Sequence, residues 1–216
     1  MAHAGLGVLK VSGLVKIGVF IVLSPVIGMV MGFIFMVATY WIFRKSTPQS
    51  VSGLFRRLQL LSSAAYSLGH GGNDAQKTMG IILAVLISGG FLTVDAEVPL
   101  WVVLSCHAAM GLGTLAGGWR IVKTMGQRIC HLQPVHGFSA ESAGALCLYG
   151  ATWLGIPVST THIICTSIMG VGSTMGASTV KWGVARSIVM AWILTIPISA
   201  LIGFVAFAVI RVFIGY

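Results

Sequence analysis

Long apolar runs separated by short polar gaps recur along the whole chain. We expect helices over 14–43, 58–92, 99–118, 138–155, 158–177 and 186–212. Most of these runs reach about the 20 residues that a helix needs to cross the hydrocarbon core of a bilayer. Only 8% of the 216 residues are charged, whereas soluble domains carry about 25%. We therefore predict an all-α, polytopic membrane protein in which residues 1–216 form one transmembrane domain.

The positive charges lie between the apolar runs. The chain has 13 lysines and arginines against four acidic residues, and the cations gather at about 44–57 and 119–137. By the positive-inside rule we expect both segments to be cytoplasmic loops of a multi-pass protein in the plasma membrane, the inner membrane of the cell, surrounded by lipid. The basic residues are not interleaved with aromatic ones, so we expect no nucleic-acid partner.

Glycine pairs spaced four residues apart occur on three of the predicted helices. They are Gly28/Gly32, Gly113/Gly117 and Gly172/Gly176. Small residues at this spacing let helix backbones approach closely in a bilayer. We interpret these glycines as packing positions and assign them no chemistry.

The most polar stretch inside an apolar run is the nonapeptide 69–77, which contains three glycines. Ionisable groups at membrane depth usually face a cavity, a partner or a transport pathway. A break in a membrane helix is tolerated where the freed backbone is buried or lines a cavity. We expect the glycines to interrupt the run at 69–74 and divide it into two half-helices.

A helix that restarts near Ala75 would place its polar residues at an anion-binding position. Asn73 and Asp74 would lie in the cap region, and Gln76 and Lys77 in the first turn, where free amides attract anions. His70, within the same stretch, would support the site. The alternative is that Asn73 or Asp74 only caps the helix and that Lys77 pairs with Asp74.

A second break is predicted at Pro157, between the apolar runs 138–155 and 158–177. Proline stops the incoming helix because it lacks a backbone donor. The two pieces form either two full spans or one re-entrant hairpin. Glu141 is an acid at the start of the first piece. It either reaches the interface or forms a cation or proton site.

Three consecutive hydroxyl residues follow this proline. Ser159, Thr160 and Thr161 can offer hydroxyls and amides to the oxygens of a tetrahedral anion. The alternative is simple helix capping and bonding to the preceding turn. His162 follows directly and is a candidate supporting residue for the same site.

No other cofactor chemistry is indicated. The four cysteines form no CxxC pair, so we expect no metal site and no cofactor. The spacing of Ser159 or Asp74 relative to His162 or His70 does not build a nucleophilic triad. We therefore expect a protein that is not an enzyme, with an intramembrane hydrolase as the alternative of another class.

The two breaks together resemble the inorganic phosphate transporter family, the Pit-type permeases. That family carries a glycine-x-asparagine-aspartate core in each of two inverted halves. Residues 71–77 are similar to the form in the second half of bacterial low-affinity members, and residues 138–141 with 155–162 are similar to the family's other recurring element. The first-half signature is missing here. The resemblance therefore implies the C-terminal half of an inverted-repeat transporter with broken or re-entrant helices.

The resemblance also implies a function and a set of site residues. The expected function is symport of inorganic phosphate with a proton or sodium, with a complementary N-terminal half, a second copy of the chain, or both as partners. The expected phosphate-binding residues are Asn73, Asp74, Gln76, Lys77, Ser159, Thr160 and Thr161. The expected coupling-ion residues are Asp74, Asn73 and Glu141. The alternatives are a permease for sulfate or another oxyanion and a membrane scaffold without transport.

Overall fold

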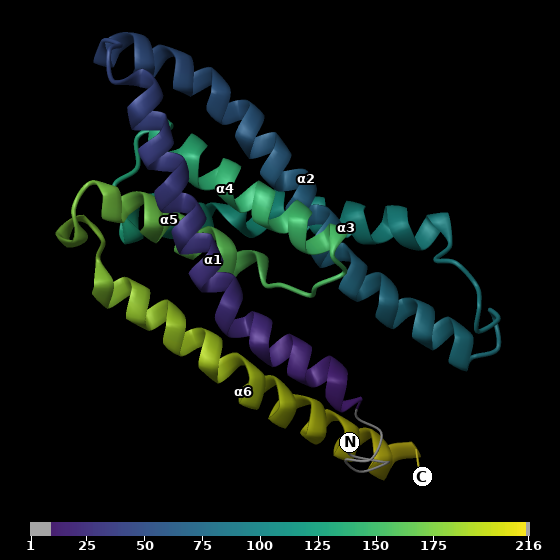
Figure 1. Ribbon diagram of the computed structural model, residues 1–216. Helices are drawn as coiled ribbons and strands as arrows, with labels where there is room; N and C mark the ends of the chain where they lie inside the picture. Colours follow the sequence, from purple (N-terminus) through teal and green to yellow (C-terminus); the bar gives the residue numbers. More distant parts are fainter. Residues whose placement is uncertain (1–9, 215–216) are drawn as a thin grey trace.

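The computed structural model describes residues 10–214, and all regular elements in that range are helical (Figure 1). The long helices are α1 (Val11–Phe43), α2 (Pro48–Ser88), α3 (Leu100–Lys123), α4 (Pro134–Trp153), α5 (Thr160–Thr174) and α6 (Trp182–Ile214). A π-helical turn η2 (Thr124–Ile129) follows α3, and a 3-10 turn η3 (Ala177–Thr179) precedes α6. The all-α prediction is confirmed.

Three of the helices are long and apolar enough to cross a membrane. They contain the spans Val11–Phe43, Leu100–Trp119 and Trp182–Phe213. Helix α2 has 41 residues but is not one of the three. Several of its polar side chains, among them Ser62 and Asn73, are turned toward the hairpin of α4 and α5, where they form the contacts described below.

The expected break at 69–74 is wrong, because α2 runs without interruption through the glycine-rich stretch. In the described residues, positive φ angles occur only at Gly90, Gly155 and Gly176. Glycine permits a break but does not force one. Breaking the helix would leave backbone groups without partners at membrane depth, which costs more than the roughly 1 kcal/mol of helix propensity lost per glycine. Residues 75–77 therefore do not begin a new helix.

Helices α4 and α5 form a hairpin whose two outer ends lie at the same end of the bundle. Pro134, at the start of α4, and Met175, just after α5, line a single pocket. The 15 residues of α5 extend about 22 Å, less than the roughly 30 Å hydrocarbon core. Neither α4 nor α5 is among the described helices that are long and apolar enough to cross a membrane, which favours the re-entrant hairpin over two full spans. The turn between the helices passes through Gly155, whose φ of 61° suits glycine.

The two basic segments, 44–57 and 119–137, also lie at that end, but a smaller part of each is loop than expected. Helix α2 already begins at Pro48, and helical structure continues after α3 to Ile129. Proline occupies the first turn of both α2 and α4, where its missing N–H has no helical partner in any case. Most of 44–57 and 119–137 is thus helical.

Helix α1 crosses the hairpin in direct backbone contact with α5 (Figure 1). A Cβ atom on Gly32 would collide with the backbone of Ser167, and one on Gly170 would collide with the backbone carbonyl of Met29. Ser167 Oγ donates a hydrogen bond of 3.1 Å to the carbonyl oxygen of Gly28 across this crossing. The Gly28/Gly32 pair therefore packs as predicted. The Gly113/Gly117 pair has no neighbour of this kind within 4 Å.

We predict that Gly32→Ala destabilises the protein, because the added methyl group overlaps the α5 backbone, which cannot rotate away. The expected loss is about 1–3 kcal/mol of unfolding free energy, measured by thermal unfolding in detergent. Gly18→Ala is the matched control, since Gly18 lies on the same helix with nothing within 4 Å. Equal unfolding temperatures for the two variants would contradict a tight α1–α5 crossing.

Candidate functional site

The candidate site is centred on the carboxylate of Asp74, on the face of α2 that meets the tip of the hairpin. Lys77 Nζ lies 2.9 Å from Oδ1 of Asp74. His70 Nε2 lies 3.0 Å from Oδ2, and Thr160 Oγ1 donates to the same oxygen at 2.8 Å. These residues come from two elements, with His70, Asp74 and Lys77 spaced three and four residues apart on α2. Both carboxylate oxygens are therefore held by charged or hydroxyl donors.

Asn73 ties this centre to the turn before α5. Its Nδ2 donates to Asp74 Oδ1 at 3.1 Å and to the backbone carbonyl of Val158 at 3.2 Å. Lys77 Nζ donates to the same carbonyl at 3.3 Å. Asn73 is buried, so its amide needs these partners. The turn is thus fixed to α2 by two side chains of the nonapeptide.

The start of α5 faces the same centre. Ser159 is the N-cap, and its Oγ accepts from the backbone N–H of His162 at 3.4 Å. The first amides of a helix have no intrahelical acceptor, so those of Thr160 and Thr161 are available to an anion. Thr160 is buried against Asp74, whereas Thr161 is exposed. The hydroxyl run therefore supplies one buried and one accessible side chain.

The predicted residues Gln76 and His162 lie apart from these contacts. Gln76 is on the exposed face of α2, because a residue two positions from Asp74 points to the far side of a helix. The imidazole of His162 stacks on the indole of Trp192 in α6, with ring centroids 3.9 Å apart. His162 therefore anchors α6 to the hairpin.

Glu141 forms a second, separate centre. Ser62 Oγ donates to its Oε2 at 2.6 Å, and Gln59 also hydrogen-bonds to the carboxylate. Ser62 and Asp74 are twelve residues apart on α2, which corresponds to about 18 Å along the helix axis. The structure does not bring Glu141 to the Asp74 centre.

Tyr66 is a site residue that the sequence reasoning missed. Its hydroxyl donates to the backbone carbonyl of Thr160 at 3.3 Å, and its ring stacks on His70 with centroids 6.0 Å apart. A signal was present, because positions 62, 66, 70 and 74 follow a four-residue spacing that places them along one helix face. Tyr66 was assigned no role from the sequence.

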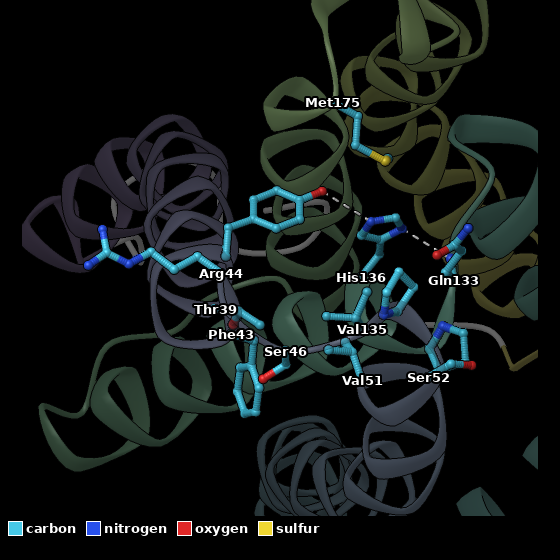
Figure 2. Close-up of a pocket in the computed structure, with 13 residues that line it drawn as sticks. Thr39, Phe43, Arg44, Ser46, Val51, Ser52, Gln133, Val135, His136 and Met175 are labelled. Atoms are coloured by element: carbon cyan, nitrogen blue, oxygen red, sulfur yellow. Dashed lines mark hydrogen bonds between the residues drawn. The ribbon is translucent and has the colours of Figure 1, made fainter.

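A hollow of about 400 Å³ lies at the other end of the hairpin, among the ends of α1, α2 and α4 (Figure 2). His136 bonds with the hydroxyl of Tyr40 at 3.4 Å and accepts from the backbone N–H of Gln133 at 3.1 Å. Figure 2 shows the guanidinium of Arg44 directed away from this hollow, and it lies over the ring of Trp41. With its polar groups paired and its cation turned outward, the hollow is a weaker anion site than the Asp74 centre.

Comparison with known proteins assigns the family. The model of the phosphate transporter family matches residues 1–203. The chain belongs to the phosphate transporter family. It is similar to a probable low-affinity inorganic phosphate transporter of Rhizobium meliloti, with 52% identity over 94% of this chain and 60% of the relative. A protein with the same description from Bacillus subtilis is 43% identical over 98% of this chain and 63% of the relative.

A solved structure supports the fold. The sodium-dependent phosphate transporter superposes with a TM-score of 0.83 at 21% identity, covering 98% of this chain and 70% of that chain. The family member described here spans about 60% of the length of the two relatives above. A function proposed for this chain therefore rests on its own site residues.

We predict that Thr160→Val lowers the stability of this family member by about 1–2 kcal/mol, because it removes a donor from the Asp74 carboxylate and leaves that oxygen short of a partner. Thermal unfolding in detergent measures the loss. Thr161→Val is the matched control and is expected to change stability by less than about 0.5 kcal/mol, since Thr161 is exposed. Equal losses would show that the Thr160–Asp74 bond contributes nothing to stability.

Proposed function

We propose that this chain forms one half of a secondary transporter of inorganic phosphate and that the Asp74 centre is its phosphate site. The observation that carries the proposal is the meeting of the α5 N-terminus with Lys77 and Asp74. Asn73, Ser159, Thr160 and Thr161 complete the site. A complementary half, from the rest of a longer protein or from another chain, would close it from the opposite side, in line with inverted-repeat transporters. We place the transporter in the plasma membrane.

The donors around Asp74 suit a tetrahedral oxyanion. Lys77 supplies a positive charge, the first turn of α5 supplies free amides, and Thr161 supplies an accessible hydroxyl. Lys77 and His70 have side chains 53% and 37% exposed, whereas that of Asp74 is 24% exposed. The donors can therefore turn from the carboxylate to an incoming anion while Asp74 stays in place.

We propose a proton rather than sodium as the coupling ion. Sodium sites in transporters use carboxylates and the carbonyls of unwound backbone, and Asp74 with the carbonyl of Val158 is such a pair. Here the ammonium group of Lys77 lies between them, 2.9 Å from the carboxylate and 3.3 Å from the carbonyl. A tethered cation thus occupies the place that sodium would need. Glu141, in its separate centre, is a further proton-binding group on this proposal.

Phosphate is favoured over sulfate by hydrogen-bond chemistry. Near neutral pH inorganic phosphate carries one or two protons and can donate a hydrogen bond to Asp74, whereas sulfate only accepts. A site with a fixed acceptor discriminates strongly against a ligand that cannot donate to it. Sulfate or another oxyanion remains the alternative substrate.

The hydrolase alternative pairs Ser159 or Asp74 with His162 or His70. His70 does lie 3.0 Å from Asp74, but that carboxylate is also bonded to Lys77 and Thr160. Ser159 Oγ caps α5 by accepting from a backbone N–H, and the neighbouring imidazole of His162 is stacked on Trp192. A nucleophile needs a general base within hydrogen-bond reach. Transport is therefore the better account of these residues.

We expect Asp74→Asn to reduce phosphate uptake to the background of protein-free vesicles, because the amide can neither carry the negative charge nor accept at both positions. Uptake is measured in vesicles containing the intact transporter, with an inward proton gradient and no sodium. Asp95→Asn is the control, since Asp95 is in an exposed loop. Normal uptake by Asp74→Asn would overturn the site, and an absolute requirement for sodium would overturn proton coupling.

We expect sulfate to inhibit phosphate uptake at least about tenfold less well than unlabelled phosphate. The same vesicles are assayed with rising concentrations of each competitor at a fixed, low concentration of labelled phosphate. Equal inhibition by the two anions would exclude phosphate selectivity and favour a general oxyanion permease.

A further inference from the structure

Two carboxylates, Glu141 and Asp74, lie at different levels along the polar face of α2, and Tyr66 lies between them. Ser62 marks the level of Glu141, and His70 marks that of Asp74. Tyr66 is four residues from each, one helical turn in either direction. The phenol is within electrostatic range of both carboxylates. Tyr66 and His70 are the residues of this four-residue series that lie between Ser62 and Asp74, and their rings stack with centroids 6.0 Å apart.

The ring of Tyr66 fills the space between α2 and the hairpin. A Cβ atom on Gly144 of α4 would come within 3.1 Å of the ring, and Ile164 of α5 lies on the same side. The ring also packs against two hydrophobic clusters, one around Cys165 and Ile168 and one around Leu148. Because Gly144 has no side chain, the ring lies directly against the α4 backbone and fills the space between α2 and the hairpin.

The hydroxyl of Tyr66 makes a separate contact, with the start of α5. It donates to the backbone carbonyl of Thr160 at 3.3 Å, and Thr160 in turn donates to Asp74 at 2.8 Å. The phenol therefore holds the first turn of α5, whose amides face the proposed anion. Ring and hydroxyl can be tested separately because phenylalanine keeps one and lacks the other.

We infer that Tyr66 is a positioning residue of the transport site: its ring is the barrier between the Asp74 and Glu141 centres, and its hydroxyl sets the position of the anion-binding turn of α5. This inference rests on the proposed phosphate site. Glu141 is the centre nearer the hollow at the Arg44 end, because α4 begins beside that hollow, and on this inference the ring separates Glu141 from Asp74.

The test compares Tyr66→Phe and Tyr66→Leu with wild type and with Tyr149→Phe. Tyr149 is a matched control, because its hydroxyl also donates to a backbone carbonyl of another helix, that of Ala65 in α2, at 3.0 Å, and it makes no hydrogen bond to α5 in the part of the chain that the structure describes. The intact transporter containing each variant is reconstituted in vesicles. Initial rates give KM and maximal velocity for phosphate, and the plateau gives the accumulation ratio.

We expect Tyr66→Phe to raise KM about three- to tenfold with maximal velocity within about twofold of wild type, since one hydrogen bond to the binding turn is lost. Tyr66→Leu is expected to let phosphate equilibrate, so that its accumulation ratio falls to near one. Tyr149→Phe is expected to match wild type in both quantities.

Each outcome decides a separate point. A Tyr66→Phe KM equal to that of Tyr149→Phe overturns the positioning role, and full accumulation by Tyr66→Leu overturns the barrier. If Tyr66→Leu does not insert, Tyr66→Trp, which keeps a ring, must accumulate phosphate for the barrier to stand. Absence of phosphate uptake by wild type contradicts the proposed function and this inference with it, whereas normal wild-type uptake with unaffected Tyr66 variants contradicts the inference alone.

Discussion

The carboxylate of Asp74 requires hydrogen-bond donors, and this requirement organises the interior of the molecule. A charged group away from bulk water is costly unless it is paired and hydrogen-bonded. Three donors, on His70, Asn73 and Lys77, come from the same helix. The fourth, Thr160, comes from the hairpin. The need of one carboxylate therefore fixes the tip of the α4–α5 hairpin against the middle of α2.

The residues of this centre could be predicted from the sequence, but the backbone that presents them could not. Asn73, Asp74 and Lys77 stand out because polar groups are rare in apolar runs, and the Ser159–Thr161 run follows a proline. Both signals are local. Whether Gly71 and Gly72 break a helix depends on the whole length of α2 and on its packing against α4. The prediction of a break rested on the glycines of 69–77. The backbone hydrogen bonds that an unbroken helix keeps at membrane depth outweighed their effect.

The position of Glu141 depends on the register between α2 and α4. The identities of the polar residues alone do not give this register. Helices α2 and α4 run side by side in the same direction, with Ser62 beside Glu141, Tyr66 beside Gly144 and Gly69 beside Leu148. By this register α4 ends, at Trp153, at about the level of Asp74. Glu141, three turns earlier in α4, therefore belongs to another level of the bundle. Only the pairing of the two helices reveals this separation.

The side chain of Lys77 shows how the ion pair with Asp74 can open. Its ammonium group neutralises Asp74 and holds the carbonyl of Val158. Its long side chain is half exposed, so it can reorient toward an anion by rotating bonds that cost little on the helix surface. Asn73 and Thr160 are buried and keep the hairpin in place during that change. On the proposed function, binding would exchange the Lys77–Asp74 ion pair for one between Lys77 and the anion.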